Sequence, residues 1–94
     1  MARIIWTHQA SKDLEQHYLY VAEQSQRYAE ALVERIINAI ERLEDFPLSG
    51  RVVPEFELYH IREVIVSNYR VVYRLKAEHV EVITIHHSSR PLLF

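Results

Sequence analysis

Arginines and histidines are the side chains in this sequence that are best suited to chemistry. Arginine outnumbers lysine by nine to two, which favours planar, bidentate contacts with carboxylates or phosphates over a diffuse positive field. Five arginines are candidates for such contacts because they lie in predicted strands or in the segments that border them: Arg51, Arg62, Arg70, Arg74 and Arg90. In antiparallel neighbours these side chains can converge on one sheet face and its rim. The alternative is that they pair with Glu55, Glu63 or Glu81 on a solvated sheet surface.

His86 and His87 are the histidines best placed for acid–base chemistry, because they stand at the end of a predicted strand. An unperturbed imidazole titrates near neutrality and can act as a general acid or base. A polar strand end is the plainer interpretation of the same pair. Neighbouring strand residues point to opposite faces, so the two rings cannot share a metal ion in regular geometry. With no cysteine, no His-Glu-x-x-His pattern and a single glycine, the sequence predicts no metal site, no phosphate-binding glycine loop and no cofactor.

Length and composition are those of a small globular protein. The chain has 94 residues, 49% of them hydrophobic and 26% charged, with a formal net charge of −2, and residues 1–94 are expected to form one domain. The lack of cysteine excludes disulfides and thiolate catalysis. No apolar run approaches the roughly 20 residues that span a bilayer and no secretory signal is visible, so the cytoplasm is the expected compartment, without membrane contact. The slightly acidic balance argues against broad nucleic-acid affinity, and no direct sequence-specific binding of nucleic acid is expected.

The first half of the chain predicts a short strand followed by two helices. Residues 3–6 are rich in strand formers, and Thr7 offers an N-cap for a helix over residues 8–24. Ser25 can cap a second helix, which ends before Pro47. The apolar positions of that helix form one stripe, namely Ala29, Leu32, Val33, Ile36, Ile37, Ile40 and Leu43. The short connection makes the two helices an αα-hairpin.

The second half predicts an antiparallel meander after an irregular loop. The single glycine, Gly50, is expected to need a positive φ angle. Residues 60–66, 69–75 and 80–86 are dense in Val, Ile and Tyr, with turns at residues 67–68 and 76–79. The tail, residues 88–94, is expected outside the sheet. The resulting α+β fold has two layers, with the helical hairpin on one sheet face and arginines on the other, open face.

Four sequence pieces, in this order, resemble the RelE/ParE superfamily of type II toxins. They are Pro47-x-Ser49-Gly50-Arg51, Ile61-Arg62-Glu63, the run Asn68-Tyr69-Arg70-Val71-Val72-Tyr73-Arg74, and Ile83-Thr84-Ile85-His86-His87 with Arg90. The preceding strand and helical hairpin also match, so the resemblance covers nearly the whole chain. It implies a helix hairpin packed on a curved antiparallel sheet, and a cognate antitoxin whose flexible C-terminal part wraps and neutralises the toxin.

Within the superfamily the sequence is more similar to the ParE-like branch, which implies a toxin that poisons DNA gyrase by protein binding rather than an enzyme. The lysines typical of RelE-like nucleases are absent, since Ile61 and Glu63 occupy their places. The resemblance makes Arg70 the principal target-binding candidate, with further candidates at Arg51, Arg62, Tyr69, Arg74 and Arg90. The alternative is a RelE-like, ribosome-dependent mRNA endoribonuclease, with Arg70, His86 and His87 as its catalytic residues.

Overall fold

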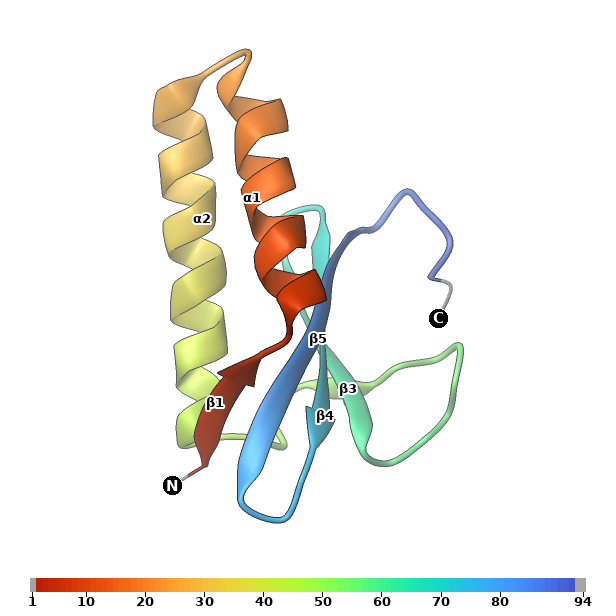
Figure 1. Ribbon diagram of the computed structural model, residues 1–94. Coiled ribbons are helices and arrows are strands. Elements are labelled where there is room, and N and C mark those ends of the chain that lie inside the picture. Colours follow the sequence, from red (N-terminus) through yellow and green to blue (C-terminus); the bar gives the residue numbers. More distant parts are fainter. Residues whose placement is uncertain (1, 93–94) are drawn as a thin grey trace.

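A five-stranded sheet and a helical hairpin form the two layers of this protein (Figure 1). The computed structural model describes residues 2–92. In chain order the elements are β1 (Arg3–Trp6), α1 (His8–Ala22), α2 (Gln26–Glu41), a 3-10 helix (Arg42–Glu44), β2 (Arg51–Val52), β3 (Ile61–Val66), β4 (Tyr69–Leu75) and β5 (His79–His87). The predicted α+β fold, with an N-terminal strand, a helical hairpin and a three-stranded meander, is confirmed.

The strand order in the sheet is β1-β5-β4-β3-β2. β1 runs parallel to β5, whereas all the other neighbours are antiparallel. The two-residue strand β2 was not predicted, because Pro54 follows it closely and no longer run of strand formers marks it. Within residues 2–92 no helix is both long and apolar enough to cross a membrane.

Both helices begin at the predicted caps. The Thr7 side-chain oxygen accepts a hydrogen bond from the Ala10 amide at 3.1 Å and donates to the Val82 carbonyl at 2.8 Å. The Ser25 side chain accepts from the Tyr28 amide at 3.0 Å. Each bond satisfies an amide that the first helical turn leaves without a partner. Thr7 therefore also fixes the start of α1 against β5.

The main core lies between α2 and the sheet. Ala29, Leu32, Ile36 and Ile40 are buried on α2, and they pack in one cluster with sheet residues that include Val66, Tyr69, Val71, Val82 and Ile85. The predicted stripe is correct at these positions. Ile37 departs from it with 36% of its surface exposed, because a helix turns about 100° per residue and this position lies at the edge of the buried face.

The second sheet face is more covered than the sequence suggested. Val53, from the segment after β2, and Leu92, from the C-terminal tail, are buried against Ile61 and Val72. Both segments fold back over the sheet and hide apolar strand residues. The prediction of an open face is therefore wrong in this region, although the tail does lie outside the sheet up to residue 92, the last that the structure describes.

Gly50 is required by a close approach and not by its backbone angle. Its φ is not positive, so that part of the prediction is wrong. A Cβ atom at this position would lie 2.5 Å from the Tyr73 hydroxyl and 2.6 Å from the Glu63 carbonyl oxygen. The hydroxyl of Tyr73 accepts from the Gly50 amide at 3.0 Å and donates to the Pro47 carbonyl at 2.7 Å. This buried tyrosine therefore holds the whole loop against the sheet.

Candidate functional site

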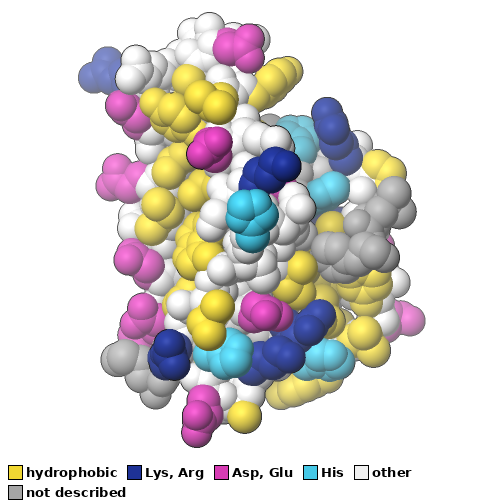
Figure 2. Space-filling model, in the orientation of Figure 1, with side chains coloured by type: hydrophobic (Ala, Val, Ile, Leu, Met, Phe, Trp, Pro, Cys, Tyr) yellow, Lys and Arg dark blue, Asp and Glu magenta, His cyan; other side chains and the backbone are white. Residues whose placement is uncertain are grey.

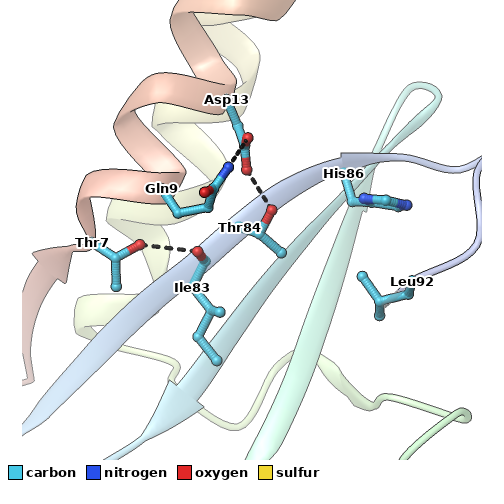
Figure 3. A pocket seen from close by; sticks show the side chains of 7 residues that line it. All are labelled: Thr7, Gln9, Asp13, Ile83, Thr84, His86 and Leu92. Atoms are coloured by element: carbon cyan, nitrogen blue, oxygen red, sulfur yellow. Dashed lines mark hydrogen bonds between the residues drawn. The ribbon is translucent and has the colours of Figure 1, made fainter. Parts of the chain in front are cut away.

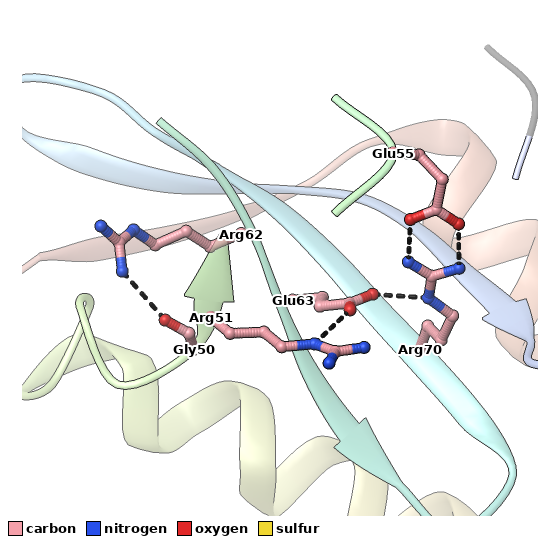
Figure 4. Close-up of polar contacts among 6 residues, drawn as sticks. All are labelled: Gly50, Arg51, Glu55, Arg62, Glu63 and Arg70. Atoms are coloured by element: carbon pink, nitrogen blue, oxygen red, sulfur yellow. Dashed lines mark hydrogen bonds and ion pairs between the residues drawn. The ribbon is translucent and has the colours of Figure 1, made fainter. Parts of the chain in front are cut away.

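Four charged side chains form a compact ionic network on the second sheet face (Figure 4). Glu63 of β3 is at its centre, with a side chain that is 0% exposed. The Arg70 Nε atom lies 2.5 Å from one Glu63 oxygen, and the Arg51 Nε atom lies 2.7 Å from the other. The remaining two nitrogens of Arg70 donate to both oxygens of Glu55 at 2.6 Å each. Arg70 thus binds two carboxylates at once.

Strand register brings this network together. Arg51 of β2 is directly opposite Glu63 of β3, and Arg70 of β4 pairs with Ile65, two residues further along β3. Residues two apart on a strand share a face, so Arg51, Glu63 and Arg70 project on the same side. Glu55 reaches Arg70 from the loop that connects β2 to β3. The carboxylate pairing that the sequence analysis held open is therefore present.

The network is electrically balanced, with two guanidinium groups and two carboxylates. Hydrogen bonds from Arg70 hold the pKa of Glu55 well below its ordinary value of 4.5, at about 2. The same bonds, first to Glu55 and then to Glu63, raise the pKa of the Arg70 guanidinium. Only 11% of the Arg70 side chain is exposed. This arginine is consequently a structural cation whose charge is already matched, not a free donor for an incoming phosphate.

Two further candidate arginines lie outside the network. Arg62 projects from the opposite face of β3, where it donates to the carbonyls of Gly50 and Tyr59 at 3.0 Å each and covers the Tyr59 ring at 4.6 Å. Arg74 is 3.7 Å from Glu81, and its Nε atom is buried without a hydrogen-bond partner among the described residues. The predicted convergence on one face therefore holds for Arg51 and Arg70 but not for Arg62.

A second cluster joins helix α1 to the end of β5. The His17 Nε2 atom lies 2.6 Å from the Ile85 carbonyl, and the His17 ring is 4.6 Å from the ring of Tyr69. The rings of Tyr69 and His87 make a T-shaped contact, with their centroids 5.1 Å apart. Burial, with lesser effects of the nearby Tyr28 and Tyr20, raises the pKa of the Tyr69 hydroxyl. Arg90 follows directly in the turn after β5.

Asp13 provides the polar link between α1 and β5 (Figure 3). One of its oxygens accepts from the Thr84 hydroxyl and, at 3.2 Å, from the Ile85 amide. The other accepts from the Gln9 side chain at 2.7 Å. Gln9, Asp13 and Thr84, together with Thr7 and His86, line a hollow of about 480 Å³. In the part of the chain that the structure describes, no three His, Asp or Glu side chains are arranged to hold a metal ion.

Comparison with known proteins identifies the family. The sequence model of the ParE toxin of type II toxin-antitoxin systems, parDE, matches residues 4–92. The chain belongs to the ParE toxin family.

The fold of this ParE family member is similar to that of a solved structure, the chromosomal ParDE TA system from P. aeruginosa. The TM-score is 0.76 at 22% sequence identity, and the match covers 93% of this chain and 96% of that chain. No curated protein sequence matches this one. At this identity the structural likeness concerns the fold alone, while the family model carries the assignment.

The sequence analysis missed some residues that hold this ParE family fold together. Asp13 and His17 were not singled out, because on a helix they look like ordinary polar positions of a solvated face. Their role depends on where β5 passes beneath α1, which no local pattern encodes. His86 and His87 were identified, and the register places them opposite Arg70 and Tyr69 respectively.

The Glu55–Arg70 pair gives this ParE family member an acid-sensitive contact. Because the folded state lowers the Glu55 pKa to about 2, the pair stabilises the protein above about pH 4.5 and this contribution is lost as the pH falls towards 2. We expect the melting temperature of the wild type to drop more steeply across that interval than that of Glu55→Gln. Thermal unfolding followed by circular dichroism measures both profiles. Parallel profiles for the two proteins would contradict the assignment.

Proposed function

We propose that this ParE family member is the toxin of a toxin–antitoxin pair that inhibits DNA gyrase by protein–protein binding. A cognate antitoxin binds and neutralises it, and both act in the cytoplasm. The observation that carries the proposal is the family match over residues 4–92, since the ParE-like branch is the one that the sequence resemblance links to gyrase. No catalytic residue is assigned in this proposal.

The charge balance of the ionic network supports gyrase binding over RNA cleavage. A nuclease that attacks a phosphodiester needs cations that are free to stabilise the charge developing on the phosphorus centre. Here Arg70 is occupied by two carboxylates, those of Glu63 and Glu55. A phosphodiester monoanion brought to this face would meet a network whose two guanidinium groups are already paired with two carboxylates, so no net positive charge is left to attract it.

Arginines at the rim are the candidates for contact with gyrase. The Arg51 side chain is 61% exposed even though its Nε atom binds Glu63, and 41% of the Arg74 side chain is exposed. Arginine is favoured at the energetic centres of protein interfaces because it combines a long apolar stem with a flat set of donors. Arg62 lies in β3, and Arg90 lies in the turn that follows β5.

A second candidate function is ribosome-dependent cleavage of mRNA, and one observation favours it. His86, His87 and Arg90 lie together at the end of β5, where the His86 Nε2 atom is 2.9 Å from the Arg90 carbonyl. This contact is to the Arg90 backbone, but His86, His87 and Arg90 also line one hollow. A ribonuclease could use an imidazole as a base and a guanidinium as a cation in such a hollow. For Arg70 to act with His86, His87 and Arg90, its ion pairs with Glu55 and Glu63 would first have to break.

The order of events in cells separates the two functions. We expect that expression without the antitoxin traps cleaved DNA and induces the DNA-damage response while bulk translation continues at first. Pulse labelling of new protein and a damage-response reporter, followed in the same culture, measure both. Arrest of translation before any damage signal, with mRNAs cut inside codons, would contradict the gyrase proposal.

A further inference from the structure

A polar hollow of about 490 Å³ lies between α1 and the end of β5. We call it the β5-end pocket and define it by Gln16, His17, Tyr20, Tyr69, His87 and Arg90. Figure 2 shows histidine and basic side chains gathered beside the helical hairpin on this side of the molecule. The ionic network on the second sheet face does not contribute to it.

Two strong donors in the β5-end pocket have no partner within residues 2–92. The His87 Nδ1 atom accepts from the Ser89 amide at 3.2 Å and lies 2.6 Å from the Ser89 hydroxyl oxygen, which can donate to it. We assign Nδ1 as the acceptor in both contacts, which places the proton of the neutral ring on Nε2. The guanidinium group of Arg90 makes no ion pair and no hydrogen bond with any described residue, whereas Arg51, Arg70 and Arg74 each pair with a glutamate. Among residues 2–92, no carboxylate is paired with this arginine.

Asp13 also lines the pocket, but it makes no ion pair or hydrogen bond with Arg90 or His87. Asp13 accepts from the Thr84 hydroxyl, the Ile85 amide and the Gln9 side chain, so both of its oxygens are already occupied. The Nε2 proton of His17 is likewise used, since it lies 2.6 Å from the Ile85 carbonyl, which can only accept. The Arg90 guanidinium and the His87 Nε2–H group therefore remain available to bind a ligand. A carboxylate is a planar acceptor that can bind both donors.

The ligand that fits this pocket is a protein side chain and not a nucleic-acid phosphate. Arg90 is the only lysine or arginine among the residues that line the pocket, whereas a polyphosphate backbone is held by several cations together. Tyr20, which lines the pocket, is 72% exposed, and its sequence neighbour Leu19 is 57% exposed. Tyrosine and arginine together are typical of the centres of protein interfaces.

We infer that the β5-end pocket receives an aspartate or glutamate side chain of the antitoxin, bound by Arg90 and the His87 Nε2 proton, with a neighbouring apolar side chain against Tyr20. This inference rests on the proposed toxin–antitoxin function and names the chemistry of the contact. It also assigns Arg90 to the antitoxin interface.

Binding of a synthetic peptide tests the inference. The peptide covers the C-terminal half of the protein encoded by the reading frame next to this gene, and its affinity is measured by isothermal titration calorimetry. We expect Arg90→Gln to weaken binding by about tenfold or more, and His87→Gln to weaken it in the same direction. The control variant Arg42→Gln changes an exposed arginine in the 3-10 helix that follows α2, and it should bind within about twofold of wild type. Unchanged melting temperatures of the variants exclude a folding defect.

A double-mutant cycle identifies the partner carboxylate. Alanine substitution of each acidic residue of the peptide should reveal one whose effect disappears in the Arg90→Gln background. If the wild type binds the peptide but Arg90→Gln and His87→Gln bind equally well, the pocket assignment is wrong while the toxin–antitoxin proposal stands. If the wild type does not bind the peptide at all, both are wrong. Binding of a mixed-sequence oligonucleotide that depends on Arg90 would instead assign the pocket to phosphate and overturn the inference.

Discussion

Replacing Arg70 by methionine is expected to lower the free energy of unfolding by about 3–5 kcal/mol, because it leaves a buried carboxylate without its closest cation. Glu63 is 0% exposed and keeps only the contact with Arg51, whose own side chain is 61% exposed. Small domains are stable by only about 5–15 kcal/mol in total, so the variant should be close to unfolding at moderate temperature. Urea denaturation followed by tryptophan fluorescence gives the change directly.

Two further variants isolate the cause of this loss. Arg74→Met removes an arginine from the same strand and face, but its partner Glu81 is 3.7 Å away and 28% exposed, so the cost should stay within about 1 kcal/mol. The double variant Arg70→Met, Glu63→Met replaces the buried pair by apolar side chains and should recover most of the stability. A double variant as unstable as Arg70→Met alone would show that the loss came from packing rather than from an unpaired charge.

Replacing Ile36 by alanine is expected to cost about 2–5 kcal/mol, because it opens a cavity at the centre of the main core. Ile36 is 0% exposed and belongs to the cluster that joins α2 to strands β3, β4 and β5. The same unfolding experiment measures the loss. Since Glu63, Arg70 and His87 project from these strands, the variant should also weaken any partner binding in proportion to its unfolded fraction.

Ile37 is the matched control because it follows directly on the same helix. It is 36% exposed, so its replacement by alanine should cost about 1 kcal/mol or less. Equal losses at both positions would mean that the buried face of α2 is centred between them and that the helix register described here is incorrect.

Local sequence signals were sufficient for the elements of this fold. Thr7 and Ser25 each offer a side-chain oxygen before an amphipathic run, and both cap a helix as predicted. The residues 69–75, dense in β-branched and aromatic side chains, coincide with β4. These features depend on hydrogen bonds and periodicities within a few residues of the chain, which is why the sequence alone identifies them.

Features that depend on distant segments could not be predicted in this way. The parallel pairing of β1 with β5 joins residues more than seventy positions apart. Whether Arg70 is free or paired with Glu55 depends on where the loop that carries Glu55 lies. The sequence of that loop has no regular pattern from which its position could be predicted. Gly50 looked like a turn glycine, yet its small size is needed because Tyr73 of β4 packs against it.

The central claim is that this ParE family member acts on gyrase by binding and not on mRNA by cleavage. A supercoiling assay with purified toxin and gyrase, run beside a cleavage assay with mRNA programmed on ribosomes, tests it most directly. We predict that supercoiling is inhibited with accumulation of cleaved DNA, while the mRNA remains intact. Ribosome-dependent cleavage that disappears in His87→Ala, with gyrase unaffected, would contradict the account.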